Sequence, residues 1–182
     1  MNVLTTPTDS NFLPDATASA ITAIDFAYWQ WRGIETICVD LDSTLLPHGG
    51  VELDTDNLRA LQNQPLPIII ATNRLGAEGV RKIVRELDTA AIITADSWLT
   101  KKPSRAYFQK LTIASGHTAA QTLMIGDRIV QDIWGANHAG LRTVMVEKLG
   151  HQPWREKIFG AIDRWAMQKL LIATNNLGVI AR

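Results

Sequence analysis

The sequence has little cysteine and no net charge. Cys38 is its one cysteine, which excludes an internal disulfide framework and fits a reducing compartment. Because Cys38 lies between the apolar residues Ile37 and Val39, we interpret it as a small core residue and not as a reactive thiol. Basic and acidic residues balance at 18 each, which argues against a nucleic-acid partner bound through bulk charge.

Long hydrophobic runs are also absent. No stretch approaches the roughly 20 apolar residues that a helix needs to cross a bilayer, and the N-terminus lacks the pattern of a signal peptide. We therefore expect a cytoplasmic protein, soluble or at most peripheral to the inner face of a membrane. With no repeat, low-complexity tract or long linker, the 182 residues predict a single domain.

The sequence does contain short apolar runs, many with β-branched residues, that alternate with segments of helical length. Such runs are typical of parallel strands covered on both faces. Their alternation with helices predicts an α/β fold, a three-layer, doubly wound, mainly parallel sheet. The expected strands are 34–41, 67–71, 90–94, 122–125 and 141–146. The expected helices between them are about 54–64, 75–87, 103–115 and 129–138.

A predicted helix flanks this core of about 33–150 on each side, at about 16–31 and about 154–172. The second helix is amphipathic, and its apolar face carries Trp154, Ile158, Ile162 and Trp165. Packing of that face on the sheet is the ordinary interpretation. Basic residues elsewhere on the helix also fit an interfacial helix beside anionic lipid.

Asp40 and Asp42 end the first expected strand. In extended chain this spacing directs both side chains to the same face. Two carboxylates so close repel unless one takes a proton or a cation intervenes. In either case one carboxylate can attack phosphorus while the other transfers a proton. Acidic turn residues without a catalytic role are the alternative for an isolated pair.

Polar residues also follow later strands. Thr72 and Asn73 offer a hydroxyl and an amide to a phosphoryl oxygen, beside the N–H groups of the following helix, although they equally suit a plain helix cap. Lys102 precedes a helix start, where the helix dipole disfavours a cation unless it faces an anion. Lys101 is a rival for this role, and the sequence does not separate the two lysines.

Asp127 follows the fourth expected strand, and Asp132 comes five residues later. A helix that begins near residue 129 brings the second carboxylate close to the first, and Gly126 allows a close approach of the backbone. Hard oxygen ligands of this kind suit Mg²⁺. Helix capping by Asp127 is the alternative.

The order Asp-x-Asp-x-Thr, Thr, Lys-Pro, Gly-Asp-x₄-Asp, each beyond a strand, resembles the four motifs of the haloacid dehalogenase (HAD) superfamily of phosphohydrolases. The resemblance implies that the strands bearing Asp40 and Asp127 are neighbours. It also implies that Asp40 is the nucleophile that forms an aspartyl-phosphate and that Asp42 is the general acid/base. Thr72 would bind the phosphoryl group and Lys102 would neutralise its charge. The implied Mg²⁺ ligands are Asp40, the backbone carbonyl of Asp42, Asp127 and Asp132.

HAD enzymes with small soluble substrates usually carry a cap domain after the first motif or between the second and third. Here 29 residues separate Asp42 from Thr72, and 29 separate Thr72 from Lys102. One helix and one strand fill each gap, so we expect no cap. An uncapped site needs a large partner to exclude water, which is a protein, a nucleic acid or a lipid surface.

Within a likeness that spans roughly 12–150, a closer resemblance is carried by the segments 12–15, 33–34, 40–45, 101–103 and 126–137. They resemble the YqeG/Gep4 group of capless HAD phosphatases, whose mitochondrial members are phosphatidylglycerophosphate phosphatases. This implies a phospholipid monoester substrate at a membrane surface and a role in phospholipid biosynthesis. Arg74 departs from the plainer polar residues expected after Thr72-Asn73.

Other functions stay open at this stage. The same chemistry serves a phosphorylated nucleic-acid end, sugar or protein. A phospho-receiver signalling module also sets Asp, Thr and Lys on a doubly wound sheet, but it has no need of a second aspartate such as Asp42. A scaffold without activity is a further alternative, although every expected catalytic position is filled.

Overall fold

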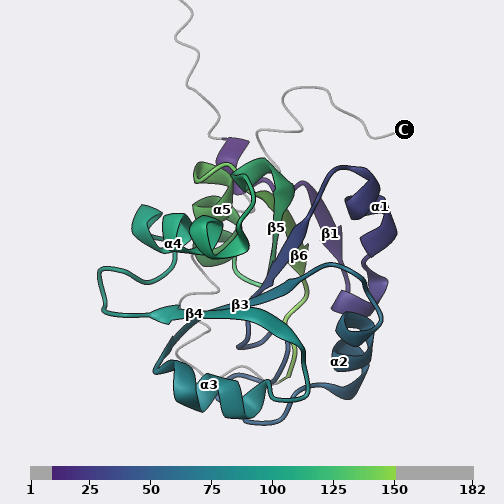
Figure 1. Ribbon diagram of the computed structural model, residues 1–182, viewed down its shortest axis with the longest axis vertical. Helices are drawn as coiled ribbons and strands as arrows, with labels where there is room; N and C mark the ends of the chain where they lie inside the picture. Colours follow the sequence, from purple (N-terminus) through teal and green to yellow (C-terminus); the bar gives the residue numbers. More distant parts are fainter. Residues whose placement is uncertain (1–9, 151–182) are drawn as a thin grey trace, which may run out of the picture.

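The computed structural model describes residues 10–150, which form a six-stranded sheet in the order β1-β6-β5-β2-β3-β4 (Figure 1). All neighbouring strands run parallel. The predicted α/β class, with a doubly wound parallel sheet, is therefore confirmed. The strands are β1 Ala16–Ala18, β2 Thr36–Val39, β3 Ile68–Leu75, β4 Thr89–Ala95, β5 Thr122–Gly126 and β6 Arg142–Val146.

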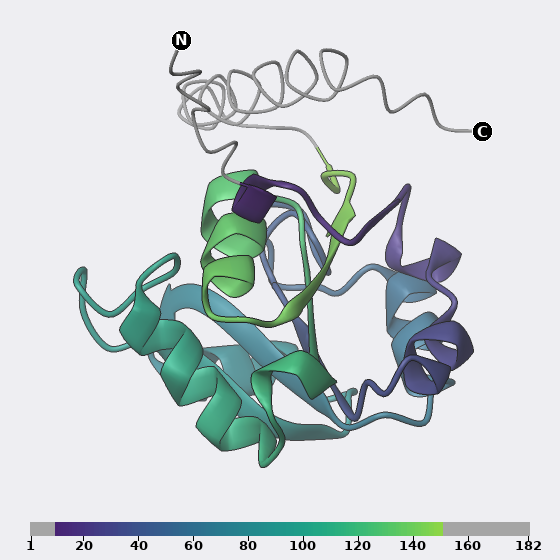
Figure 2. The same cartoon turned by 90° about the horizontal axis from the view of Figure 1, so that it is seen from above.

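The helices cover both faces of the sheet, with α1 and α2 on one side and α4 and α5 on the other (Figures 1 and 2). Their bounds are α1 Phe26–Trp31, α2 Thr55–Gln62, α3 Ala77–Ile83, α4 Arg105–Ser115 and α5 Gly135–His138. A π-helical turn, Ile129–Trp134, leads directly into α5. Short 3₁₀ turns lie at Ser10–Phe12, Ile21–Ala23 and Ala119–Gln121.

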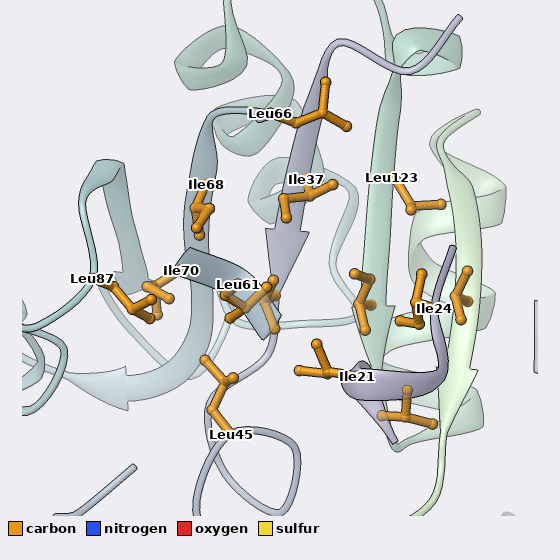
Figure 3. Close-up of a cluster of buried hydrophobic side chains, with 14 of the residues drawn as sticks. Ile21, Ile24, Ile37, Leu45, Leu61, Leu66, Ile68, Ile70, Leu87 and Leu123 are labelled. Carbon is orange, nitrogen blue, oxygen red and sulfur yellow. The ribbon is translucent and has the colours of Figure 1, made fainter. Parts of the chain in front are cut away.

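The strands divide the core into two clusters, because successive side chains of a strand point to opposite faces. In β2, Ile37 and Val39 face the first cluster, whose side chains Figure 3 shows, whereas Cys38 faces the second. The helices α1, α2 and α3 cover the first cluster, and α4 and α5 cover the second. Both faces of the central strands are therefore buried, which explains why their sequences read as continuous apolar runs.

The predicted helix at 16–31 is wrong over its first half. Ala16–Ala18 is the edge strand β1, which pairs with Val144–Val146 of β6. A 3₁₀ turn follows at Ile21–Ala23, and only Phe26–Trp31 is α-helical. The carboxylate of Asp15 accepts a hydrogen bond from the N–H of Thr143 (2.8 Å), which ties the segment to the sheet edge. The helix begins later because the side chain of Asp25 caps it and accepts a hydrogen bond from the N–H of Tyr28 (2.9 Å).

Two further boundaries differ from the prediction. The helix expected from residue 103 begins at Arg105, because Ser104 supplies its N-cap. Strand β3 continues to Leu75, with a shift of register against β4 between Ala71 and Leu75. Thr72 and Asn73 therefore lie within a distorted strand end and not directly before α3.

The two segments where a cap domain would be inserted lie wholly within the described residues. Between Asp42 and Thr72 the chain forms a loop, α2 and the first half of β3, and between Thr72 and Lys102 it forms the rest of β3, α3 and β4. No helix in residues 10–150 has the length and hydrophobicity to span a bilayer. The predicted amphipathic helix at 154–172 lies outside the described residues, and the single domain over 1–182 stays a prediction.

Candidate active site

The carboxyl ends of three adjacent strands bring the predicted residues together. Asp40 follows β2, which pairs with β5 on one side and β3 on the other. The predicted adjacency of the strands that lead to Asp40 and Asp127 is therefore confirmed. The site lies at the point where the connections from neighbouring strands run to opposite faces of the sheet. Ligands usually bind at this point in doubly wound folds.

Lys102 joins the loops around this point. Its ammonium donates hydrogen bonds to Asp40 Oδ1 (2.5 Å), Asp132 Oδ1 (2.6 Å) and the carbonyl of Ala71 (2.8 Å). Burial alone would lower the pKa of Lys102, but the neighbouring carboxylates of Asp132 and Asp40 outweigh it and raise the pKa. Lys102 therefore stays charged, although only 1% of its surface is exposed.

Lys101 points elsewhere. Its ammonium lies over the ring of Trp98, 3.5 Å from the ring centroid, which is a cation–π arrangement. Of the two candidate lysines, Lys102 is the one whose ammonium lies among the carboxylates.

Asn73 holds the backbone of Lys102 in place. Its Oδ1 accepts a hydrogen bond from the N–H of Lys102 (2.8 Å), and its Nδ2 donates to the carbonyl of Lys102 (3.3 Å) and to Gln131 Oε1 (3.1 Å). We predicted that this amide binds substrate, whereas here it is engaged in positioning the lysine. Thr72 is buried, and its Oγ1 accepts from the N–H of Arg74 (3.1 Å). A hydroxyl that accepts one hydrogen bond can still donate another.

Three carboxylates gather beside Lys102. Asp40, Asp127 and Asp132 each offer an oxygen, and these oxygens all lie within 4.8 Å of one another. Burial, followed by the neighbouring carboxylates, raises the pKa of Asp127 to about 7. Burial also raises the pKa of Asp40, to about 8, despite the opposing effect of Lys102. The site therefore lacks enough positive charge of its own to ionise Asp40 and Asp127 fully at neutral pH.

These residues fit a hard divalent cation. Asp127 Oδ2 is buried and accepts no hydrogen bond from any residue in 10–150. The ammonium of Lys148 lies 3.7 Å from this oxygen, beyond hydrogen-bond distance. A buried carboxylate oxygen without a donor is a natural metal ligand, and clustered carboxylates suit Mg²⁺. The side chain of Asp42 lies outside this group, and the contribution of its backbone carbonyl stays a prediction.

The side chain of Asp132 lies very close to the backbone of Gly126. A Cβ on Gly126 would lie 2.5 Å from Cγ of Asp132, so a side chain at residue 126 would displace that carboxylate. The N–H of Arg128 donates to Asp132 Oδ2 (3.1 Å) across the start of the π-helical turn. The sequence predicts a close approach of the backbone at Gly126, and in the structure the side chain of Asp132 occupies the space that a Cβ there would need.

The loop after β2 is tightly wound. Ser43 adopts a left-handed backbone with φ of 65°, which is costly for a residue with a side chain and is common at functional sites. Its N–H donates to the carbonyl of Leu46 (2.7 Å). The hydroxyl of Thr44 donates to Asp127 Oδ1 (3.2 Å), so this loop also orients a carboxylate of the acidic group.

Arg74 forms the least expected contact of the site. Its Nε donates to Asp42 Oδ2 (2.8 Å), and its Nη2 donates to Asp42 Oδ1 (2.7 Å) and to the carbonyl of Gly50 (2.8 Å). Burial alone would raise the pKa of Asp42, but the hydrogen bonds from Arg74 and Gly49 outweigh it and lower the pKa. The guanidinium thus holds the second aspartate of the Asp-x-Asp pair as a carboxylate.

The sequence pattern identified Asp40, Asp42, Lys102 and the later aspartates, but it missed other members of the site. Arg74 stood out only as a departure from the family pattern. Thr44 belongs to the Asp-x-Asp-x-Thr motif, but its contact with Asp127 was not predicted, and Lys148 gave no signal at all.

The structure places a buried ammonium among three carboxylates at the carboxyl ends of parallel strands, an arrangement that suits phosphoryl chemistry. Residues 99–156 match the family model described as HAD-hydrolase-like. Over 53 residues the chain is 40% identical to the glyceraldehyde 3-phosphate phosphatase of Pyrococcus abyssi (strain GE5 / Orsay), covering 29% of this chain and 22% of that protein. Over 74 residues it is 38% identical to the phospholysine phosphohistidine inorganic pyrophosphate phosphatase of Xenopus laevis, covering 41% of this chain and 27% of that protein.

Both matches thus cover about a quarter of the length of these relatives. Among solved structures, an uncharacterized protein from Listeria monocytogenes serotype 4b superposes with a TM-score of 0.53 at 18% identity, covering 65% of this chain and 84% of that one. This likeness bears on the fold alone. Together, the family match and the phosphatase relatives support an enzyme of the HAD-like phosphatase class.

Proposed function

We propose that the protein is a Mg²⁺-dependent phosphomonoester hydrolase that acts through an aspartyl-phosphate on Asp40. The observation that carries the proposal is the buried ammonium of Lys102 between Asp40 and Asp132, with Asp127 completing the acidic group. The carboxylates of Asp40, Asp127 and Asp132, with the carbonyl of Asp42, would hold the cation. Bound Mg²⁺ would offset the negative charge of the phosphoryl oxygens.

In the first step, a carboxylate oxygen of Asp40 attacks phosphorus and the bond from phosphorus to the leaving-group oxygen breaks. Asp42 gives a proton to that oxygen once the substrate has displaced Arg74, because the bound guanidinium otherwise keeps Asp42 ionised. Lys102 and the hydroxyl of Thr72 stabilise charge on the transferring group. In the second step, Asp42 removes a proton from water, the water oxygen attacks phosphorus, and the bond to Asp40 breaks. Inorganic phosphate leaves and both aspartates return to their starting states.

We further propose a membrane phospholipid monoester, phosphatidylglycerophosphate, as the substrate. The resemblance to the capless group and the absence of an inserted cap between residues 42 and 102 support a large or surface-borne substrate. The loop between β4 and α4 extends away from the sheet in both views (Figures 1 and 2). It carries Trp98, 81% exposed, and Leu99, 86% exposed, next to Lys101. Aromatic, aliphatic and basic side chains together favour a membrane interface.

A smaller phosphorylated substrate is the second candidate. The names of the matched relatives, which include a glyceraldehyde 3-phosphate phosphatase, favour it. Phosphorylated nucleic-acid ends, sugars and proteins belong to the same alternative. A receiver module is disfavoured because the Asp-x-Asp pair supplies a group for proton transfer beside the nucleophile.

The activity is tested with p-nitrophenyl phosphate in the presence of Mg²⁺ and of EDTA. We expect turnover that requires the metal and vanishes in Asp40→Asn. Asp96→Asn is the matched control, because Asp96 is an exposed aspartate paired with Lys110 on the surface. Wild-type turnover in Asp40→Asn would exclude the covalent mechanism.

The substrate is tested by comparing phosphatidylglycerophosphate in mixed micelles with phosphosugars, phosphorylated oligonucleotides and a phosphopeptide. A higher kcat/KM for the lipid supports the first candidate. Preference for any of the soluble classes would replace it with the second.

A further inference from the structure

Arg74 connects Asp42 to a cavity of about 470 Å³ that lies between the end of β3 and α3. The guanidinium contacts Asp42, while the residue also lines the cavity. The cavity is mostly apolar and includes a second basic residue, Lys82, and no acidic residue within 10–150 lines it. The lining side chains are Val51, Leu75, Val80 and Ile83 with the basic Arg74 and Lys82.

This cavity has an exposed apolar rim. Leu75 is 70% exposed and Val51 is 69% exposed, so two aliphatic side chains face solvent beside the catalytic loops. Lys82 lies 3.8 Å from Glu78 on the same helix, and both side chains are largely exposed. Such a pair contributes little, so the ammonium of Lys82 can turn to a ligand in the cavity at small cost.

The contact between Arg74 and Asp42 covers one edge of the carboxylate. Nε and Nη2 of Arg74 bind both oxygens, and the N–H of Gly49 also donates to Oδ1 (3.0 Å). A leaving-group oxygen must approach this carboxylate for Asp42 to act on it. A group that takes the guanidinium away from Asp42 would open that edge. Phosphate and carboxylate groups do this best, because they match the two-pronged geometry of arginine.

We propose that Arg74 and this cavity form the leaving-group subsite. The substrate is a phosphomonoester whose leaving group carries a second anionic group and an apolar part. The second anion binds Arg74 in place of Asp42, and the apolar part lies against Val51 and Leu75. This inference rests on the proposed phosphatase function. The same chemistry is present in a lipid with a phosphodiester headgroup and in a soluble bisphosphate.

The experiment compares hexyl phosphate with hexanediol bisphosphate, which adds only the second anion, and with phosphatidylglycerophosphate in mixed micelles. We expect a kcat/KM for wild type that is about tenfold or more higher with the bisphosphate than with hexyl phosphate. In Arg74→Ala the ratio of kcat/KM for the bisphosphate to kcat/KM for hexyl phosphate should fall to about one. In Arg74→Lys the ratio should lie between the wild-type and Arg74→Ala values, because a lysine keeps the charge but not the paired donors.

Arg81→Ala is the matched control. Arg81 is an exposed arginine of α3 that lies 3.7 Å from Glu78 and does not line the cavity, so the preference should survive its removal. Leu75→Asp should lower kcat/KM for the bisphosphate more than for p-nitrophenyl phosphate, because it places an anion on the rim. Equal losses for hexyl phosphate and the bisphosphate in Arg74→Ala would overturn the proposal and leave Arg74 as a residue that only orients Asp42.

Two measurements separate this inference from the proposed function. Metal-dependent hydrolysis of p-nitrophenyl phosphate, lost in Asp40→Asn, tests the function by itself. Calorimetric binding of hexanediol bisphosphate to Asp40→Asn tests the subsite without turnover, and Arg74→Ala in that background should weaken binding about tenfold or more. Unchanged affinity would overturn the subsite whatever the catalytic result.

A preference for the lipid as well as the bisphosphate identifies a lipid headgroup as the source of the second anion, and a preference for the bisphosphate alone identifies a soluble substrate.

Discussion

At the residue scale, the central interaction is the ion pair of Lys102 with Asp40 and Asp132. All three side chains are largely buried, and the ammonium bridges two carboxylates that would otherwise repel. Removing one partner of a buried ion pair leaves uncompensated charge, which typically costs about 3–5 kcal/mol. In the proposed mechanism, the same ammonium stabilises charge on the transferring phosphoryl group.

Lys102→Met should therefore affect both stability and catalysis. We expect a loss of about 3 kcal/mol in the free energy of unfolding and a fall of about a hundredfold or more in kcat for p-nitrophenyl phosphate. Urea denaturation and steady-state kinetics measure the two effects. Lys101→Met is the control, since its ammonium lies over Trp98. If both variants lost the same activity, Lys102 would not be the lysine of the phosphoryl site.

Gly126 gives a second prediction at this scale. Gly126→Ala places a methyl group against Asp132, so that carboxylate must shift. We expect the Mg²⁺ concentration for half-maximal activity to rise about tenfold or more, as for other changes that misorient metal ligands. Gly79→Ala is the control, because a Cβ there meets nothing within 4 Å. An unchanged metal requirement in Gly126→Ala would argue against Asp132 as a ligand.

At the element scale, the central strands could be predicted because each carries its own signal. The run Ile68-Ile69-Ile70 is apolar on both faces whatever its neighbours are. Strand β1 could not be predicted, because Ala16 and Ala18 favour a helix. The segment is extended only because it pairs with β6, more than a hundred residues later in the sequence. The contact of Arg74 with Asp42 was not predicted for a similar reason, because the direction of the arginine side chain depends on the distorted end of β3.

The loop between β4 and α4 gives a prediction for this scale. If Trp98 and Leu99 contact a lipid surface, replacing both by alanine should lower kcat/KM for phosphatidylglycerophosphate in micelles about a hundredfold or more relative to p-nitrophenyl phosphate. Burying each apolar side chain contributes about 2 kcal/mol, and about 1.4 kcal/mol is a tenfold change. Ile113→Ala is the control, because Ile113 is an equally exposed aliphatic residue on α4. A constant ratio between the two substrates would remove this loop from the lipid proposal.

At the scale of the whole molecule, the acidic group links stability to pH and metal. The folded protein raises the pKa of Asp40 to about 8 and that of Asp127 to about 7, whereas both are about 3.9 in an unfolded chain. Between these values the folded state holds protons that the unfolded state has lost. Without metal, these two groups therefore make the protein less stable as the pH rises from about 4 to about 8.

A bound divalent cation replaces those protons, so its stabilising effect should increase with pH. We expect a larger Mg²⁺-induced rise in Tm at about pH 8 than at about pH 5.5, because at the lower pH the cation must displace protons from Asp40 and Asp127. Scanning calorimetry of the metal-free and Mg²⁺-loaded protein measures this difference. Asp127→Asn should reduce it, whereas Asp96→Asn should not, since Asp96 lies on the surface. An equal Tm shift at both pH values would mean that the cation binds outside the group formed by Asp40, Asp127 and Asp132.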